Sequence, residues 1–235
     1  MWNNVDLLNR ITYSLLILAG IGLVVIVSIK ITRLDVFSIK EILITGEIHL
    51  DTKKQLESVI RERVRGGFFT IDLDDTKSTF EMLARVRMAH IRRKWPATLQ
   101  VEIVEYKPLA LWNETGFVSR QGNVVMAKVE GRLAKNLPIF KGPDQTSQDI
   151  LFFYVNTKKI LQQVGQEVVQ INVDSRYTWE VILNNGIALR LGKDRQMKRL
   201  ARFINFSRYA MGDIPEKIDY LDMRYEDGFA VGVKG

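Results

Sequence analysis

The stretch Met88 to Tyr106 reads MAHIRRKWPATLQVEIVEY, and it decides the fold of the part of the chain that follows the first apolar segment. Apolar and polar residues alternate on both sides of Pro96-Ala97-Thr98, which is typical of two β-strands joined by a turn. In the second strand the alternation puts Leu99, Val101 and Ile103 on one face. We therefore expect this face to enter a hydrophobic core.

Upstream of this hairpin the sequence predicts one strand and two helices. Residues 37–45 form the strand, which ends at Gly46. Asp51 and Thr52 are expected to cap a helix that runs to residue 64, and a second helix is expected to begin at Asp74 or Asp75. The predicted order is strand, helix, helix, strand, strand.

Further upstream, Ile11 to Ile29 reads ITYSLLILAGIGLVVIVSI, without one ionisable side chain. A helix of this length spans roughly 28 Å, close to the hydrocarbon thickness of a bilayer. A core helix would show a polar stripe, and a signal peptide would end in a small-residue cleavage site; neither is present. We predict a transmembrane helix over residues 11–31, after a short tail over residues 1–10.

Charge and cysteine content restrict the function less than the anchor does. Arg10 precedes the helix and Lys30 and Arg33 follow it, so the local charges leave both orientations open. The net charge of +7 suits anionic lipid, nucleic acid or an acidic protein surface. The chain has no cysteine, which excludes disulfides and cysteine-based metal or thiol chemistry.

Residues 107–235 are expected to form a second, mainly antiparallel β domain with two helices, so the fold class is α+β. Hairpins are predicted around Asn184-Asn185-Gly186 and Glu226-Asp227-Gly228, because Asn-Gly and Asp-Gly supply the positive φ of tight turns. The predicted helices cover residues 149–164 and 194–209. The predicted strands are 109–112, 116–119, 124–127, 137–140, 168–173, 179–183, 187–191, 220–225 and 229–233.

No catalytic pattern stands out. His49 and His90 are the only histidines, and neither has a second ligand at metal spacing. Gly66-Gly67 lacks the pattern of a phosphate-binding loop. We expect no catalytic residue, no metal and no cofactor.

The helix at 194–209 is strongly basic. Its cations suit a lipid or nucleic-acid surface. The second interpretation is a solvated face of a helix that packs on a sheet through Met197, Leu200, Ala201, Phe203 and Ile204.

The last strand also has two interpretations. It lies at a sheet edge and accepts another strand, or it only completes the sheet.

Several stretches together resemble the FtsQ/DivIB family of bacterial cell-division proteins. Each is short, but their order and spacing are specific. They are GFFTIDL (67–73), RRKWPATL (92–99), EYKPLALW (105–112), LRLG (189–192), RLARF (199–203), DMRY (222–225) and GFAV (228–231).

The resemblance implies a POTRA domain over 37–106, a partner-binding β domain over 107–235, and an inner-membrane, single-pass type II protein with periplasmic domains at the division septum. It implies a non-catalytic role that links early and late division proteins. The partners implied are FtsB and FtsL, bound by strand addition, and other division proteins at the POTRA domain; no nucleic acid is expected. The partner-binding residues implied are Arg176, Arg224, Tyr225, Gly228, Phe229 and Val231. The alternatives are a POTRA-containing secretion or membrane-assembly factor and a membrane-tethered hydrolase.

Overall fold

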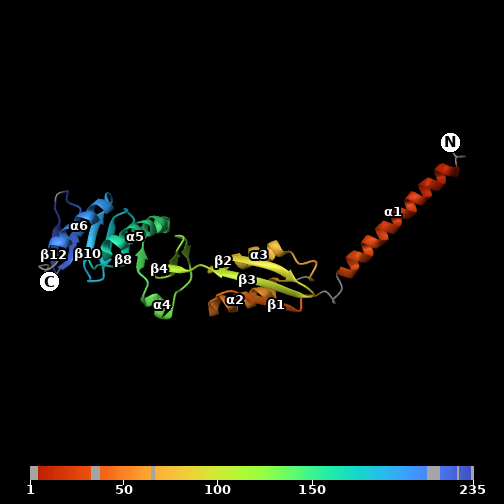
Figure 1. The fold of residues 1–235 in the computed structure, drawn as a ribbon, viewed down its shortest axis with the longest axis horizontal. Helices are drawn as coiled ribbons and strands as arrows, with labels where there is room; N and C mark the ends of the chain where they lie inside the picture. The colour runs from red at the N-terminus through yellow and green to blue at the C-terminus, as the bar shows by residue number, and fades with distance from the viewer. Residues whose placement is uncertain (1–4, 33–37, 65–66, 211–217, 227, 234–235) are drawn as a thin grey trace. The chain divides into compact units, whose positions relative to one another are not determined.

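The computed structural model describes residues 5–32, 38–64, 67–210, 218–226 and 228–233. The chain forms two compact units, Met1–Glu105 and Tyr106–Gly235 (Figure 1). The first unit contains a long N-terminal helix and a small sheet with two helices. The second unit contains a larger sheet with its own helices.

The N-terminal helix α1 covers Val5–Thr32 and contains the predicted apolar segment. Within the described residues it is the one helix long and apolar enough to cross a membrane, over Asn9–Ser28. Ser14 Oγ donates to the main-chain oxygen of Arg10 at 2.8 Å, which satisfies a polar group that would otherwise face an apolar medium. The helix is therefore suited to a bilayer despite the polar hydroxyl of Ser14.

The described part of the first unit has a three-stranded sheet in the order β1-β3-β2. Its strands are β1 Glu41–Thr45, β2 Val86–Lys94 and β3 Thr98–Glu105. β2 is antiparallel to β3 and β1 is parallel to it. Leu99, Val101 and Ile103 are buried together, so the alternation of apolar residues correctly predicted the inner face of β3.

Helices α2 (Leu50–Arg63) and α3 (Leu73–Glu81) begin earlier than predicted. The N-cap of α2 is His49, which makes no side-chain capping hydrogen bond, so the expected cap at Asp51 was wrong. In α3, Asp72 Oδ1 accepts from the main-chain nitrogens of Asp74 and Asp75 at 2.9 and 3.0 Å. A capping carboxylate lies two or three residues before the N–H groups that donate hydrogen bonds to it. The helix therefore begins just after Asp72.

The described part of the second unit has a nine-stranded sheet in the order β12-β11-β10-β9-β8-β7-β4-β5-β6. Its strands are β4 Pro108–Trp112, β5 Gly116–Ser119, β6 Val124–Val125, β7 Ile139–Lys141, β8 Val168–Val173, β9 Trp179–Leu183, β10 Ala188–Gly192, β11 Ile218–Asp222 and β12 Ala230–Val233. Three neighbouring pairs are parallel (β4/β7, β7/β8 and β10/β11) and the others are antiparallel. β7 starts after Pro138, which has no N–H to donate to a ladder.

The two predicted hairpins differ in the structure. β9 and β10 pair as expected, and Gly186 has a φ of 82°. In the second hairpin Asp222 pairs with Ala230, so the two strands end too far from the predicted turn to be joined by a tight one, and that prediction was wrong. Gly228 does not adopt a positive φ, and Asp227 lies outside the described residues.

One face of this sheet is covered by α5 (Ser147–Gln162) and α6 (Gln196–Ala210). Both helices contribute to one core with the inner faces of the strands. The short helix α4 (Gly131–Lys135) and the 3-10 helix η2 (Asp144–Thr146) were not predicted. In α6, Leu200, Phe203 and Ile204 are buried, whereas Met197 and Ala201 are exposed, so these two were wrongly placed on its apolar side.

Candidate partner-binding site

The last strand, β12, forms an end of the larger sheet. Among the described residues it pairs only with β11, through Leu221↔Val231 and the neighbouring pairs. Val231 and Val233 are 49% and 62% exposed. An edge strand presents unpaired N–H and C=O groups that can accept another strand. The structure therefore places β12 at a sheet edge, as the first of the two interpretations requires, and strand addition to this edge stays a prediction.

A glycine keeps the edge in close contact with its neighbour. A Cβ atom at Gly232 would overlap the ring of Tyr220, its partner on β11. That ring also has the guanidinium of Arg190 above it, 3.6 Å from the centroid. The absence of a side chain at Gly232 allows the Tyr220 ring to occupy this position.

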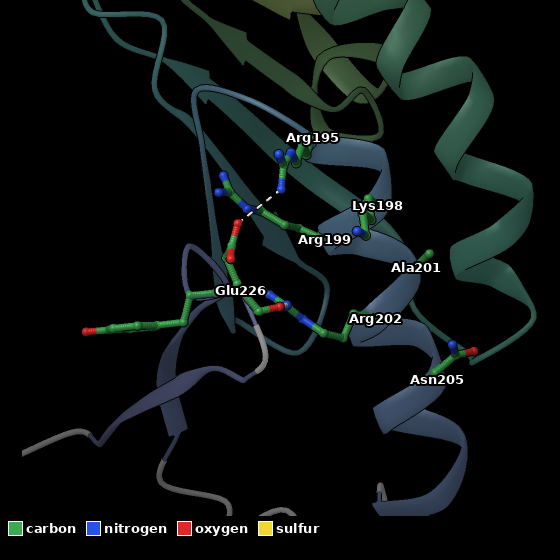
Figure 2. Close-up of a pocket in the computed structure, with 8 residues that line it drawn as sticks. Arg195, Lys198, Arg199, Ala201, Arg202, Asn205 and Glu226 are labelled. Carbon is green, nitrogen blue, oxygen red and sulfur yellow. Dashed lines mark hydrogen bonds and ion pairs between the residues drawn. The ribbon is translucent and has the colours of Figure 1, made fainter.

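Cationic side chains line one side of α6, toward the segment that follows β11. Figure 2 shows Arg195, Lys198, Arg199 and Arg202 beside the segment that carries Glu226. Arg195 Nη1 and Glu226 Oε1 are 3.2 Å apart. The segment from Met223 to Glu226 carries two of the predicted binding residues, and α6 is its immediate support.

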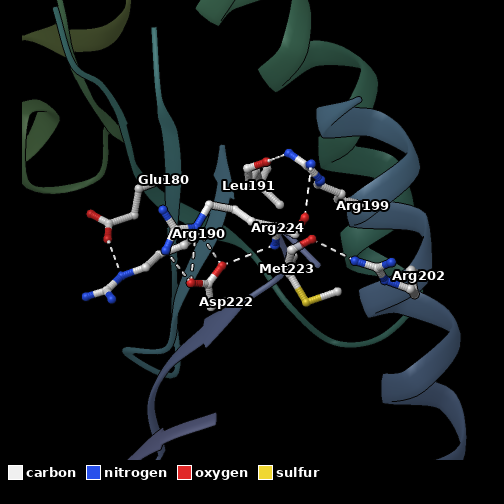
Figure 3. Close-up of polar contacts among 8 residues, drawn as sticks. All are labelled: Glu180, Arg190, Leu191, Arg199, Arg202, Asp222, Met223 and Arg224. Atoms are coloured by element: carbon white, nitrogen blue, oxygen red, sulfur yellow. Dashed lines mark hydrogen bonds and ion pairs between the residues drawn. The ribbon is translucent and has the colours of Figure 1, made fainter. Parts of the chain in front are cut away.

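Two arginines of α6 hold the main chain of this segment, and we call their contacts the arginine clamp. Arg202 Nη2 donates to the carbonyl oxygens of Met223 and Tyr225 at 2.6 and 2.8 Å, and Arg202 Nη1 donates to that of Glu226. Arg199 Nη2 donates to the carbonyl oxygen of Arg224 at 3.2 Å (Figure 3). The guanidinium groups thus satisfy four successive carbonyl oxygens that no sheet ladder uses.

The clamp extends to the end of β10, where Gly192 leaves room for it. Arg199 Nη1 donates to the carbonyl oxygens of Leu191 and Asp194 at 2.5 and 2.8 Å. Gly192 has a φ of 73°, and a Cβ atom there would lie 2.8 Å from Arg199 Nη1. Glycine is required here both for its backbone conformation and for the passage of Arg199.

The opposite face of the sheet carries a row of paired polar groups. Asn172 Nδ2 donates to Glu180 Oε2 at 3.1 Å, and Glu180 Oε1 lies 3.6 Å from Arg190 Nε. Asp222 is directly opposite Arg190 on β11, and its carboxylate accepts from Arg224 Nε and Nη2 at 2.8 and 2.5 Å (Figure 3). Each charge on this row therefore has a partner of opposite sign.

The ion pair of Asp222 and Arg224 fixes the start of the segment. The Asp222 side chain is buried, whereas that of Arg224 is 56% exposed. The hydrogen bond from Arg224 lowers the pKa of Asp222 below its ordinary value of 3.8, against the opposing effect of burial. Arg224 is thus held by a buried carboxylate and still presents charge to solvent.

This ion pair predicts a pH dependence of stability. Because the folded pKa of Asp222 lies below the unfolded one, its stabilisation is complete above ~pH 4 and is lost as the pH falls through the lower folded value. Asp222→Asn is therefore expected to reduce the free energy of unfolding at pH 7 and to flatten its decline below pH 4. Urea unfolding at pH 7, 4 and 3 measures both effects. Asp219→Asn, an exposed acid on the same strand, is the control, and an equally steep acid decline in both variants would contradict the prediction.

Arg224 lines a hollow of about 220 Å³ that reaches the turn carrying Arg176, although Arg176 itself is not part of the lining. It is lined by Arg224 and by Asp174 and Thr178, which flank Arg176 in the turn between β8 and β9. Asp174 Oδ1 accepts from the main-chain nitrogens of Thr178 and Arg176 at 2.8 and 2.9 Å. These hydrogen bonds lower the pKa of Asp174 below its ordinary value, and the bond from Thr178 has the largest effect.

The remaining predicted residues differ in accessibility. Tyr225 is 60% exposed and Val231 lies on the open edge. Phe229 instead packs against Phe206 of α6, with ring centroids 4.6 Å apart. Gly228 is half-buried, and a Cβ there would meet no atom within 4 Å. Tyr225 and Val231 are thus open to a partner, whereas Phe229 secures the loop to α6.

The arginine clamp and the two tight glycines were not recognised in the sequence. The only local signal for the clamp is the spacing of Arg199 and Arg202, which puts both on one side of a helix. Their acceptors in the segment after β11 lie more than twenty residues away and are main-chain atoms, which leave no mark in the sequence. Among the described residues, no three His, Asp or Glu side chains gather in a way that could hold a metal ion.

The fold and the site define a protein with a candidate membrane-spanning helix and an α+β part that ends in an open sheet edge. Residues 37–106 match the POTRA domain of FtsQ type, and residues 110–224 match the C-terminal domain of cell division protein FtsQ/DivIB. The chain belongs to the FtsQ/DivIB family of cell division proteins.

Curated relatives named cell division protein FtsQ match nearly the whole chain. The one from Nitrosospira multiformis is 34% identical over 98% of this chain and 98% of its own. The relative from Burkholderia pseudomallei is 31% identical over 100% of this chain and 95% of its own. The relative from Neisseria gonorrhoeae is 28% identical over 98% of this chain and 94% of its own. The resemblance found in the sequence is confirmed, and a role in cell division follows from it.

Proposed function

We propose that this protein is a non-catalytic, membrane-anchored scaffold of the division complex, which links early and late division proteins. The observation that carries the proposal is the open edge of β12, beside the exposed Tyr225 and Arg224. In this proposal residues 37–106 form a POTRA domain that docks other division proteins, and residues 107–235 form the partner-binding β domain.

The partners of the β domain are FtsB and FtsL, which bind by adding a strand to β12. Main-chain hydrogen bonds to the free edge provide affinity, and the side chains near it provide specificity. Arg224 and Arg176 pair with acidic side chains of the partner, because guanidinium groups bind carboxylates in a bidentate geometry. Tyr225 contributes apolar area and a hydroxyl group, as aromatic anchors of interfaces do.

In the proposed topology α1 spans the inner membrane, the N-terminus is cytoplasmic, and both following units are periplasmic at the division septum. A fluorescent reporter that matures only in an oxidising compartment, fused after the last residue, tests this arrangement. We expect a signal at midcell in dividing cells. Fluorescence only from a cytoplasmic reporter at the same position would refute the topology.

Binding itself is tested with Tyr225→Ala. Because Tyr225 is 60% exposed, its truncation is expected to leave folding unchanged and to weaken binding of the purified FtsB–FtsL complex by roughly 30- to 100-fold. Titration calorimetry of the full chain in detergent micelles measures the affinity. Phe152→Ala, at an exposed aromatic of α5, is the matched control. Equal affinities of the two variants would exclude Tyr225 as an anchor, and failure of the unaltered chain to bind would refute the proposed partners.

A further inference from the structure

A groove between α6 and the segment after β11 has a strongly positive lining that the proposed strand addition does not use. Its volume is about 630 Å³. Figure 2 shows side chains that line it. It is lined by Arg195, Lys198, Arg199, Ala201, Arg202, Asn205, Tyr225 and Glu226. Four of these side chains are cations and one is a carboxylate, so the described lining has an excess of positive charge.

The cations of the groove fall into two kinds. Arg199 and Arg202 donate to main-chain carbonyl oxygens, which fixes their positions without neutralising their charge. Lys198 is exposed, and it has no ion-pair partner in the part of the chain that the structure describes. The arginine clamp therefore forms a fixed positive wall, and Lys198 adds a charge that is free to bind a ligand.

Arg195 lies at the entrance of α6 in a strained conformation. Its φ is 57°, a region that side chains other than glycine and asparagine seldom adopt. Its only described ion-pair partner, Glu226, is 79% exposed at the side chain. Exposed ion pairs are weak, so a carboxylate of a ligand can replace Glu226 beside Arg195.

The groove is continuous with the proposed strand-addition site. β12 begins at Ala230, and Tyr225 and Glu226 belong to the loop that leads into it. A strand that adds to β12 and continues beyond the Ala230 end is directed toward this loop. Tyr225 thus belongs both to the proposed binding segment and to the wall of the groove.

We propose that the groove is a second subsite for the same partner, which binds acidic side chains that lie next to the added strand. This proposal rests on the proposed function, because it assumes that a partner strand occupies β12. Lys198 and Arg195 bind the carboxylates directly, and Arg199 and Arg202 contribute the surrounding positive field. The ligands are carboxylates because the proposed occupant is a protein segment, whose anionic side chains are carboxylates, and the ammonium and guanidinium groups both bind them.

The test compares two double charge reversals in the full chain, with the purified FtsB–FtsL complex as the probe. The groove variant is Arg195→Glu with Lys198→Glu, and the control is Arg132→Glu with Lys159→Glu, at exposed cations of α4 and α5. Both change the net charge equally. We expect the groove variant to bind roughly 10- to 100-fold more weakly, with a shallower dependence of affinity on salt, and the control to bind within about twofold of the unaltered chain.

Equal affinity and equal salt dependence of the two variants would overturn the subsite. So would a result in which the groove variant loses only its binding to phosphatidylglycerol vesicles and keeps its affinity for the protein partner. Failure of the unaltered chain to bind the FtsB–FtsL complex would instead refute the proposed function, which separates the two failures. Thermal unfolding of both variants, with midpoints close to that of the unaltered chain, shows that a loss of affinity is not a loss of fold.

Discussion

Replacing Ala230 and Val231 by proline, one at a time, is expected to separate partner binding from folding. Successive N–H groups of a strand point to opposite sides, so one of these two faces β11 and the other faces the open edge of β12. Proline removes the donor at its own position. The substitution on the open side should reduce affinity for the FtsB–FtsL complex by more than about 100-fold and leave stability nearly unchanged.

The proline at the position whose N–H faces β11 is expected to lower stability. It removes a ladder hydrogen bond to β11 and leaves an acceptor on that strand without its donor, so it is expected to lower the free energy of unfolding by about 1–3 kcal/mol. Urea unfolding and binding, measured on both variants, identify which side is open. Alanine at Val231 is the control for loss of the side chain alone. If both prolines bind as well as the unaltered chain, strand addition at β12 is wrong.

Much of the first unit could be predicted because its signals are local. Alternation in β3 and the turn at Pro96 depend on neighbouring residues, and the structure shows the expected buried face. The errors lie at helix starts. Asp72, Asp74 and Asp75 are all acceptable caps by residue type, and only the hydrogen bonds of Asp72 show which one begins α3.

The second hairpin shows where local signals fail. Asp227-Gly228 is a typical tight turn, yet β11 stops at Asp222. Arg224 folds back onto the buried Asp222 carboxylate, and the next carbonyl oxygens bind Arg202 instead of a neighbouring strand. Tertiary hydrogen bonds from α6 thus override the turn signal. Arg224 and Tyr225 were found only through the family resemblance, since no local pattern marks them.

A second large effect is expected from Arg202→Lys. Lysine keeps the positive charge, but its single ammonium group cannot reach the three carbonyl oxygens that the guanidinium of Arg202 binds. At least two of them lose their donor, and the free energy of unfolding is expected to fall by about 2–3 kcal/mol. The segment from Met223 to Glu226 should then exchange its amide hydrogens faster.

The same variant should weaken partner binding by roughly tenfold or more, because Arg224 and Tyr225 are no longer held in one arrangement before the partner arrives. Since the charge is kept, this loss cannot come from the electrostatic field of the groove. Arg208→Lys is the matched control on α6, because Arg208 makes one exposed hydrogen bond, to Gln163 Oε1 at 3.0 Å. Hydrogen exchange of both variants, read at residues 223–226, connects affinity to local order. If Arg202→Lys binds tightly while this segment exchanges freely, the clamp supports the fold alone and has no part in presenting the binding residues.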